Sequence, residues 1–318
     1  MWRIIIYTRS INKYLTKYST YNEKLNPNWV TGFCDAESCF QLVIYKNPKV
    51  RSGWSVRLVF SIHLHVKEVD VLYKIQKFFL VGNVTIHKDA ANFQVVSLTD
   101  LLRVMEHFNS YPLRSQKHSD FILFKKAYDL IANKEHLLDM KNLVNIRASM
   151  NKGLPERLLL EFPNANPEVR PEFTLDKNDK LFDINYWIAG FVDGEGCFYV
   201  KTSKSKTHKL GLSVTLNFIV VQGLRDMQLM EEIKLALGCG SITISESSSV
   251  IRFAVKKLSD IQNKIIPFFD RYSLVGDKLI NYEDFKRVSD LMARKSHLTK
   301  EGLDEILAIK SNMNFNRK

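Results

Sequence analysis

The spacing of hydrophobic positions along the chain changes several times, and each change predicts a new element. Residues 28–36 have the spacing of a short helix, and Pro27 with Asn28 forms a start signal. From Phe40 to Tyr45 apolar residues recur at every second position, which is the pattern of a strand with one buried face. Similar patterns predict a strand over 56–64, a helix over 67–80, strands over 84–87 and 93–97, and helices over 99–109 and 118–133. The predicted order is αββαββα.

The same order returns in the second half of the chain, because the sequence contains an internal repeat. Residues 29–40 (WVTGFCDAESCF) and 187–198 (WIAGFVDGEGCF) are identical at seven of twelve positions. Phe60 and Gly82 match Phe218 and Gly240 at the same offset of 158 residues. At an offset of 161, Phe108, Tyr111, Leu113 and Lys117 match Phe269, Tyr272, Leu274 and Lys278.

The repeat divides the chain into an N-terminal tail (1–24), a first half (25–150), a linker (151–180) and a second half (181–318). The linker is rich in Pro and Asn, with one short helix predicted near 155–161, and a closing helix is predicted over 298–313. The tail is basic and contains several Ser and Thr. It reads either as a weak mitochondrial presequence or, the reading we prefer, as the remainder of an upstream fused reading frame.

Small residues recur four positions apart in both repeated helices. Gly32 and Ala36 share one face of the first helix, and Gly190 and Gly194 share one face of the second. Small residues at this spacing allow two helix backbones to approach closely, for steric reasons that hold in any solvent. We therefore expect the two helices to pack against each other across a pseudo-twofold axis, which brings Glu37 and Glu195 side by side.

Composition narrows the class of partner. The chain has 318 residues, with 46 Lys and Arg against 34 Asp and Glu, a formal net charge of +12. This surplus suggests a polyanion such as nucleic acid, although a generally basic protein would have the same balance. The four cysteines lack zinc-ligand spacing and are expected to be buried free thiols. No apolar run reaches the roughly 18 residues of a membrane span, so no membrane partner is expected.

The repeated carboxylates are the strongest candidate for chemistry. An acid at a helix C-terminus is disfavoured by the negative end of the macrodipole, and two facing acids repel each other. A hard divalent cation such as Mg²⁺, bound by carboxylate and carbonyl oxygens, relieves this conflict and suits phosphodiester hydrolysis. The alternative is that Glu37 and Glu195 cap their helices or pair locally with lysines.

Other repeated polar residues could complete such a site. Lys117 and Lys278 are equivalent and could stabilise a phosphate. Gln222 ends a predicted strand over 212–221 and could orient an attacking water, whereas its counterpart is Leu64. Asp35 and Asp193 point elsewhere on their helices, and we expect them to bind backbone groups near the helix ends.

The polar positions of the strands form a candidate surface for reading DNA. Lys and Arg bind phosphates, and Gln, Asn, Ser and Arg can read base edges from a β-ribbon in the major groove. The alternative is a solvated sheet face. The candidate DNA-binding residues are Gln41, Tyr45, Lys46, Lys49, Arg51, Arg57, Ser61, His63, Tyr199, Lys201, Ser203, Lys204, Lys206, Lys209, Ser213, Thr215 and Asn217.

The motif Gly-Phe-x-Asp-x-Glu after an aromatic–apolar pair, present twice, resembles that of the LAGLIDADG homing endonucleases. More narrowly, the chain is similar to the single-chain, two-motif members encoded in fungal organellar introns. The likeness covers nearly everything from about residue 25 to the end. It includes Tyr111-Pro112-Leu113 with Lys117, the Asn151-Lys152-Gly153-Leu154 start of the linker, and residues 295–299 before Gly302-Leu303.

The resemblance implies an α+β fold of two pseudo-symmetric αββαββα halves, each with a saddle-shaped antiparallel sheet, joined at the two motif helices. It implies a monomer that makes a double-strand break with short 3′ overhangs in a long double-stranded DNA site. The metal would be Mg²⁺, with Mn²⁺ able to substitute and Ca²⁺ expected to bind without supporting cleavage. Glu37 and Glu195 match the family's metal ligands, assisted by the carbonyls of Ala36 and Gly194, and Lys117, Lys278 and Gln222 match its peripheral catalytic positions. A mitochondrial location follows from the same resemblance.

Two positions depart from the family pattern. Ser38 stands where Gly is usual, so an altered turn is expected after the first helix, and Leu64 replaces an expected polar residue. Both suggest unequal cleavage of the two strands, or a weakened nuclease. An RNA-binding maturase acting on its own intron and a catalytically weak DNA-binding relative are the alternatives; retention of both glutamates argues against the second.

Overall fold

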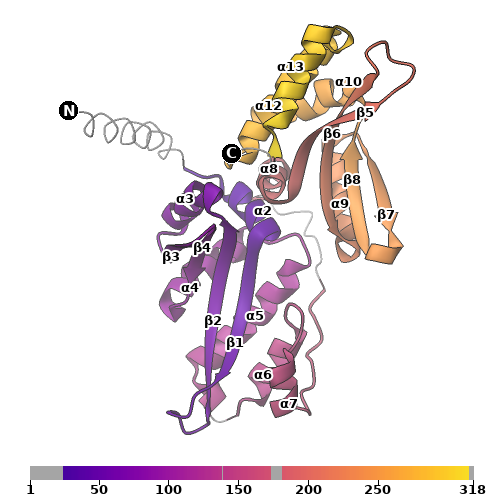
Figure 1. Ribbon diagram of the computed structural model, residues 1–318. Helices are drawn as coiled ribbons and strands as arrows, with labels where there is room; N and C mark the ends of the chain where they lie inside the picture. The colour runs from indigo at the N-terminus through magenta and orange to yellow at the C-terminus, as the bar shows by residue number, and fades with distance from the viewer. Residues whose placement is uncertain (1–23, 138, 173–180, 315–318) are drawn as a thin grey trace, which may run out of the picture.

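The structure is a computed structural model that describes residues 24–137, 139–172 and 181–314. The predicted tail, apart from Lys24, and the last part of the predicted linker therefore lie outside the described residues. Figure 1 shows two units of similar construction on either side of a central pair of helices, α2 and α8. Within the described ranges, none of the helices has the length and apolar character that crossing a membrane requires.

The first unit begins with α2 and contains one four-stranded sheet. Its elements are α2 (Pro27–Glu37), β1 (Ser38–Lys46), β2 (Trp54–His65), α3 (Val69–Phe79), β3 (Asn83–His87), β4 (Ala90–Val95), α4 (Leu98–Ser110), α5 (Lys117–Ala132) and α6 (Lys141–Ser149). A 3₁₀ turn, Val66–Glu68, precedes α3. The predicted elements are present, but α6 was missed because polar residues interrupt its short buried stripe.

The second unit repeats this order after the short linker helix α7 (Glu156–Glu161). Its elements are α8 (Ile184–Glu195), β5 (Gly196–Lys204), β6 (Leu212–Gly223), α9 (Met227–Leu237), β7 (Ser241–Ser245), β8 (Val250–Val255), α10 (Leu258–Asp260), η6 (Ile261–Ile265), α11 (Ile266–Arg271), α12 (Lys278–Ala293) and α13 (Lys300–Ser311). A 3₁₀ turn, Leu224–Asp226, precedes α9. The α+β class and the αββαββα order are confirmed.

Both sheets are antiparallel and have the same topology, β1-β2-β4-β3 and β5-β6-β8-β7. Phe40 lies opposite Phe60, and Phe198 lies opposite Phe218, with all four side chains fully buried. The ring of Phe40 packs on Phe60, Phe108, Phe121 and Phe124, and that of Phe198 on Phe218, Phe269, Tyr282 and Phe285. Since each central Phe lies three residues after a motif glutamate, the core holds the chain where it leaves each motif helix.

Two insertions explain why the repeat offset changes along the chain. His87 and Ser245, which end β3 and β7, are 158 residues apart, whereas Ala90 and Val250, which begin β4 and β8, are 160 apart. The hairpin turn of the second unit is therefore two residues longer. One more residue enters at η6, where a π-helical segment interrupts the helix that corresponds to the regular α4. An extra residue accommodated as a π-bulge leaves the flanking helical turns in place.

Candidate active site at the helix interface

Helices α2 and α8 cross in direct backbone contact at two glycines. A Cβ added to Gly32 would lie 2.0 Å from the carbonyl oxygen of Trp187, and one added to Gly190 would lie 1.9 Å from that of Trp29. A Cβ added to Gly194 would lie 2.3 Å from the Cβ of Ala36. The predicted close packing of the two motif helices is confirmed, and it is reciprocal.

The two motif aspartates fasten this helix pair to the loops before α5 and α12. Asp35 accepts hydrogen bonds from Trp187 Nε1 (2.9 Å), from Ser115 Oγ (2.6 Å), and from the backbone N–H groups of Arg114 (2.8 Å) and Ser115 (3.1 Å). Asp193 accepts from Trp29 Nε1 at 3.2 Å and from the N–H groups of Val275 and Gly276 at 2.6 and 3.2 Å. Both aspartates are buried. Their predicted role as hydrogen-bond acceptors for backbone groups is confirmed.

Glu37 and Glu195 end the two helices and lie next to each other. The Oε1 of Glu37 is 3.2 Å from the position that a Cβ on Gly194 would occupy, one residue before Glu195. Burial raises the pKa of both carboxyl groups, and the charge of Glu37 raises the pKa of Glu195 further. The nearby ammonium groups of Lys278 and Lys117 oppose these effects. The interface thus holds two half-buried acids whose ionised forms need a cation.

The two repeated lysines supply cations at the same helix ends. Lys117 Nζ donates to the carbonyl oxygens of Cys34 (3.0 Å) and Ala36 (3.1 Å), and Lys278 Nζ donates to that of Gly194 (2.6 Å). Burial lowers the pKa of both ammonium groups, whereas the surrounding acids raise it. The carbonyls expected to assist a metal therefore already face a positive charge, and each retains a second lone pair.

The two halves differ beside the glutamates. The side chain of Gln222, at the end of β6, interacts with Glu195 and partly offsets the rise in the pKa of that carboxyl group. Its counterpart Leu64 is 6% exposed and cannot do so. On that side Glu37 instead opens into a cavity of about 420 Å³ that is also lined by His63, Leu64, His65, Glu68, Asp89 and Ala90.

The turn after α2 is not altered by Ser38, contrary to the expectation from sequence. Ser38 has φ −84° and ψ 162°, and Gly196 has φ −75° and ψ 156°. Ser38 Oγ also donates to the carbonyl of Cys34 at 2.6 Å. A Cβ on Gly196 would lie 2.5 Å from Cγ1 of Val192, so the smaller Cys34 leaves the room that Ser38 needs.

Cysteine burial differs from the expectation. Cys34 is buried, but Cys39, Cys197 and Cys239 are only partly covered. Cys39 and Cys197 occupy equivalent positions opposite Ser61 and Ile219. All four are free thiols, as expected.

Most of the predicted DNA-binding residues lie on the sheet faces that the helices leave open. They alternate with the core residues, and the register places Lys201 opposite Thr215 and Ser203 opposite Ser213. Their side chains are partly or largely exposed. On the strands this group comprises Gln41, Tyr45, Arg57, His63, Tyr199, Lys201, Ser203, Ser213 and Thr215.

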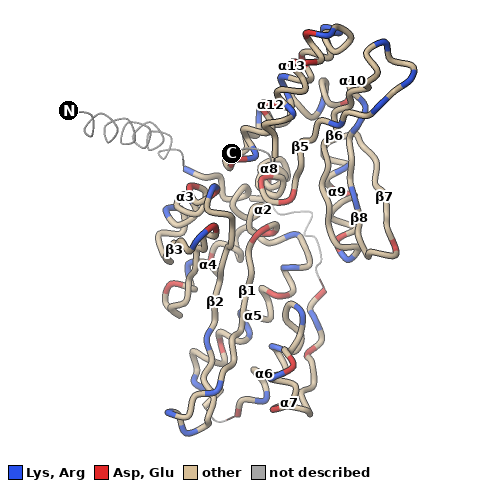
Figure 2. The backbone as a smooth tube through the Cα atoms, viewed as in Figure 1, with Lys and Arg blue, Asp and Glu red and all other residues tan. Residues whose placement is uncertain are grey.

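The remaining basic candidates lie at strand ends and in hairpin turns. Lys49, Arg51, Lys204, Lys206 and Lys209 are exposed, and Figure 2 shows basic residues at the β1–β2 turn and along the β5–β6 loop. Lys46 differs, because its position in the alternation of β1 is on the same side as the core residues. Its ammonium group pairs with Glu161 of α7 at 2.5 Å. The structure thus directs Lys46 toward the linker helix and away from the open face.

Two candidates on the open faces are covered by their neighbours. Ser61 is 6% exposed and accepts a hydrogen bond from Gln41 Nε2 at 3.2 Å. Asn217 is 5% exposed and lies opposite Tyr199. Neither reaches the surface, so a direct contact of Ser61 or Asn217 with a partner would require its neighbours to move.

The predicted DNA-binding residues did not include the polar residues of β3, β4, β7 and β8. The open faces continue across β3 and β4 and across β7 and β8, where polar residues alternate with apolar ones. The same alternation in the sequence could have identified these residues, although each of the strands is short. The exposed or half-exposed residues are Asn83, Thr85, His87, Asn92, Gln94, Ser241, Thr243, Ser245 and Arg252.

Comparison with known proteins places this geometry in a family. The model of the LAGLIDADG endonuclease family matches residues 30–128 and 188–289. "Probable intron-encoded endonuclease 3" of Neurospora crassa is 38% identical over 298 residues, which is 91% of this chain and 55% of that protein. "Probable intron-encoded endonuclease 2" of the same organism is 34% identical over 301 residues, 91% of this chain and 65% of that protein. The chain thus spans between half and two thirds of the length of these curated relatives.

Solved structures resemble the chain over nearly its whole length. The meganuclease I-SmaMI bound to uncleavable DNA is 37% identical, with a TM-score of 0.88 covering 93% of this chain and 99% of that one. The LAGLIDADG homing endonuclease I-LtrWI bound to target DNA is 39% identical, with a TM-score of 0.88 covering 93% of this chain and 100% of that one. The chain therefore belongs to the LAGLIDADG endonuclease family, in its single-chain form with two motifs.

Proposed function

We propose that this chain is a site-specific DNA endonuclease that hydrolyses one phosphodiester bond in each strand of a long double-stranded target, leaving short 3′ overhangs. One observation carries the proposal. Two half-buried glutamates lie side by side at the ends of paired helices, between two sheets whose open faces are polar. Paired acids at this position suit cleavage of a backbone that bridges the two sheets.

The residues at the helix ends fit a divalent cation, which we propose is Mg²⁺. Among the described residues no group of three or more acidic, His or Cys side chains is arranged to hold a metal, so side chains alone do not complete a site. The carboxylates of Glu37 and Glu195 with the carbonyls of Ala36 and Gly194 form an all-oxygen donor set, which a hard cation prefers. The ammonium groups of Lys117 and Lys278 donate to these carbonyls, which supports the proposal that positive charge is favoured here. When bound, the metal would lower the pKa of a water and neutralise charge on the phosphate.

The surrounding side chains have separate roles in this proposal. Lys117 and Lys278 lie close enough to the glutamates to stabilise the extra negative charge of the phosphorane-like transition state. Gln222 interacts with Glu195, and its amide can orient the attacking water on one side only. The corresponding position near Glu37 has Leu64, so the two strands should be cut at different rates.

The open sheet faces supply the DNA contacts. Exposed Lys and Arg in the hairpin turns would bind phosphates, and the polar residues on the strands would read base edges. The solved relatives named above are described as bound to DNA, and one as bound to cleaved DNA. We propose that the chain acts on DNA as a monomer in a fungal mitochondrion, since a Podospora anserina relative is described as lying in an ND4 intron.

The test is cleavage of a plasmid that carries the intron-less host gene, or of targets selected from a randomised DNA library. The wild-type protein should linearise the plasmid with Mg²⁺ and lose this activity when EDTA removes the metal. Glu195→Gln should bind the target with unchanged affinity but slow its cleavage by about 100-fold or more, because the amide cannot replace the carboxylate as a metal ligand.

Gel-shift affinity and single-turnover cleavage should be measured on the same preparations. Glu231→Gln is the matched control, since Glu231 is an exposed residue of α9 whose side chain pairs with Lys234 at 3.5 Å. Normal cleavage by Glu195→Gln, or loss of activity in the control, would contradict the assignment.

A further inference from the structure

Lys117 is the first residue of α5, so the preceding loop determines where its ammonium group lies. That group reaches the carbonyls of Cys34 and Ala36, next to Glu37. Part of the loop is held within its own half, because the N–H groups of Arg114 and Ser115 bind Asp35. The last residue before the lysine, Gln116, is held differently.

The N–H of Gln116 is bound by the other half of the molecule. It donates to Oδ1 of Asp226 at 2.8 Å, across 110 positions of sequence. Asp226 is only 6% exposed and lies in the 3₁₀ turn before α9. The same helix provides Glu232, whose Oε2 pairs with Arg114 Nη2 at 3.0 Å, with both side chains largely covered. Asp226, just before α9, and Glu232, within it, therefore bind the loop that precedes Lys117.

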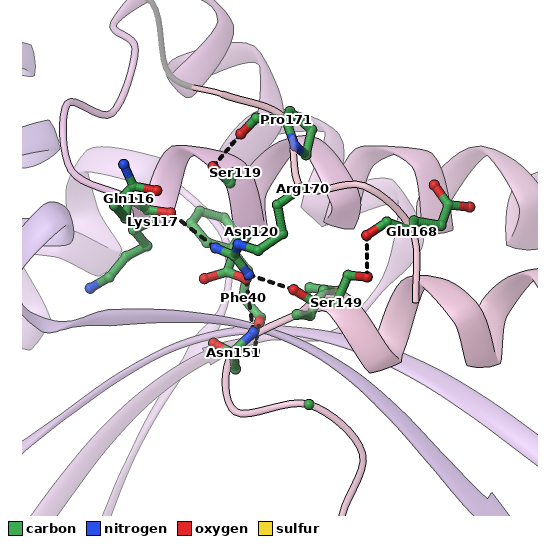
Figure 3. Close-up of polar contacts among 12 residues, drawn as sticks. Phe40, Gln116, Lys117, Ser119, Asp120, Ser149, Asn151, Glu168, Arg170 and Pro171 are labelled. Atoms are coloured by element: carbon green, nitrogen blue, oxygen red, sulfur yellow. Dashed lines mark hydrogen bonds and ion pairs between the residues drawn. The ribbon is translucent and has the colours of Figure 1, made fainter. Parts of the chain in front are cut away.

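The carbonyl of Gln116 is bound by the linker. It accepts from Nη2 of Arg170 at 3.3 Å, while Nη1 of the same residue binds Asp120 at 2.8 Å and the carbonyl of Ser149. Figure 3 shows the guanidinium inserted between Gln116, Asp120 and Ser149. Asp120 is 4% exposed and also accepts from the N–H of Asn151. One linker side chain thus joins the beginning of α5 to the end of α6.

The second half keeps the asparagine contacts of this arrangement. Asn281 replaces Asp120 at the repeat offset of 161, and its Oδ1 accepts from the N–H of Asn314 as Asp120 does from Asn151. The side chains of Asn314 and Asn151 then donate to the carbonyls of Phe198 and Phe40. Arg170 binds the charged Asp120 of the first half, whereas the second half has the neutral amide of Asn281 at this position.

An acid in the position of Asp226, in contrast, is present in both halves. Glu68 is the counterpart of Asp226 at the offset of 158, and it lies near Lys278, Asp277 and Asp193. Asp226 correspondingly lies near Lys117 and Asp35. Each half therefore presents an acid to the lysine loop of the other half.

We propose that Asp226 and Arg170 are positioning residues that fix Lys117 through the backbone of Gln116, so that the second half and the linker set the cleavage rate of the strand served by the first-half lysine. The inference rests on the proposed function. Lys117 contacts the carbonyl of Ala36 beside Glu37, Lys278 contacts that of Gly194 beside Glu195, and each is expected to serve one scissile phosphate.

The experiment measures single-turnover cleavage of the two strands separately, with each strand end-labelled and Mg²⁺ present. Lys117→Ala identifies the strand that depends on this lysine. Asp226→Ala should slow that same strand about 10- to 100-fold, since small misplacements of a catalytic group have effects of this size. The other strand and DNA affinity should be unchanged, so nicked plasmid should accumulate. Asp226→Asn should restore the rate, because its amide oxygen can accept the same hydrogen bond.

Two comparisons separate positioning from a general structural role. In the Lys117→Ala background, Asp226→Ala should cause no further slowing, since both changes act on one group. Glu231→Ala, on the exposed face of α9, is the control and should cut both strands normally. Equal slowing of both strands by Asp226→Ala, or additive slowing in the double variant, would overturn the inference.

Arg170→Gln provides a second, independent reading if Asp226→Ala does not fold. It should slow the Lys117-dependent strand and leave the other unchanged, and equal slowing of both strands would again overturn the inference. A wild-type protein that cuts neither strand refutes the proposed function itself and the positioning roles with it. That result differs from all the others, because it appears without any substitution.

Discussion

Differences between the two copies of the motif come in matched pairs of side chains. The first copy has Cys34 and Ser38, and the second has Val192 and Gly196 at the same two places, one helical turn apart. The turn after each helix has nearly the same conformation. Ser38 is accommodated because Cys34 is smaller than Val, so neither exchange can be understood from one position alone.

We predict that Cys34→Val destabilises the protein by about 1–3 kcal/mol, because it crowds Ser38 in a well-packed interior. Adding Ser38→Gly should recover most of this loss, since the pair then matches the second copy. Chemical denaturation of the two single variants and the double variant tests the coupling. Additive effects of the two substitutions would contradict a shared steric cause.

The same logic applies to the residues beside the glutamates. Gln222 and Leu64 show that equivalent backbone positions carry different chemistry. We predict that Gln222→Leu slows one strand about 10- to 100-fold and leaves the other unchanged, because only one side has this amide. Strand-specific cleavage rates test this, and equal slowing of the strands would contradict it.

The helix pair α2–α8 joins the two units through backbone contact. The reciprocal approach of Gly32 to Trp187 and of Gly190 to Trp29 leaves no space for a methyl group. This close backbone contact holds the two glutamates next to each other. It also makes each unit dependent on the other for its shape.

We predict that Gly32→Ala destabilises the protein by at least about 3 kcal/mol, because its Cβ would lie 2.0 Å from a backbone oxygen that cannot move alone. Gly223→Ala is the control, since its Cβ would meet nothing closer than 3.9 Å. Thermal unfolding of both variants provides the comparison. Similar melting temperatures for Gly32→Ala and the wild type would show that the helices can separate.

A buried histidine connects α2 to α4. His107 Nε2 lies 3.0 Å from Thr31 Oγ1, and the ring packs among Phe78, Phe79, Phe108 and Tyr111. Burial lowers the pKa of His107 to about 3. The unfolded chain therefore takes up this proton first as the pH falls.

Above about pH 6.5, the pKa of His107 in the unfolded chain, this group does not reduce the free energy of unfolding. As the pH falls from there toward the folded pKa, only the unfolded chain binds the proton, so the free energy of unfolding decreases. Between pH 6.5 and 5 the wild type should lose about 2 kcal/mol more than His107→Phe, which keeps an aromatic ring but cannot be protonated. Urea denaturation at the two pH values measures this difference. Equal losses in both proteins would mean that His107 titrates normally.

Part of the positive charge of the whole molecule lies in its hairpin turns. The net charge is +12, and exposed lysines and arginines lie at the β1–β2 turn and along the β5–β6 loop. The paired cations on the helices, such as Lys286 with Asp270 at 2.6 Å, lie elsewhere. Attraction to DNA should therefore come mainly from the turns.

We predict that Lys206→Ala and Lys209→Ala each reduce the slope of log affinity against log salt by about 1, because each removes one phosphate contact. Lys286→Ala is the control and should leave the slope unchanged. Fluorescence anisotropy with labelled DNA over a range of salt concentrations measures the slopes. Unchanged slopes for the loop variants would remove these lysines from the DNA contacts.

The fold class, the repeat, the contact between the motif helices and the identity of the two central acids can all be predicted from the sequence. These features follow from local periodicity and from identical residues at a constant offset, neither of which requires knowledge of contacts. Periodicity could not reveal α6, whose apolar stripe is short and interrupted by polar residues.

The accessibility of the polar side chains and the contacts that hold the catalytic candidates depend on the tertiary structure. It buried Ser61 and Asn217, turned Lys46 toward Glu161, and brought Asp226 and Arg170 to the backbone of Gln116. The bond between Gln116 and Asp226 joins residues 110 positions apart. Contacts at such separations arise from the packing of whole elements, and no pattern of neighbouring residues encodes them.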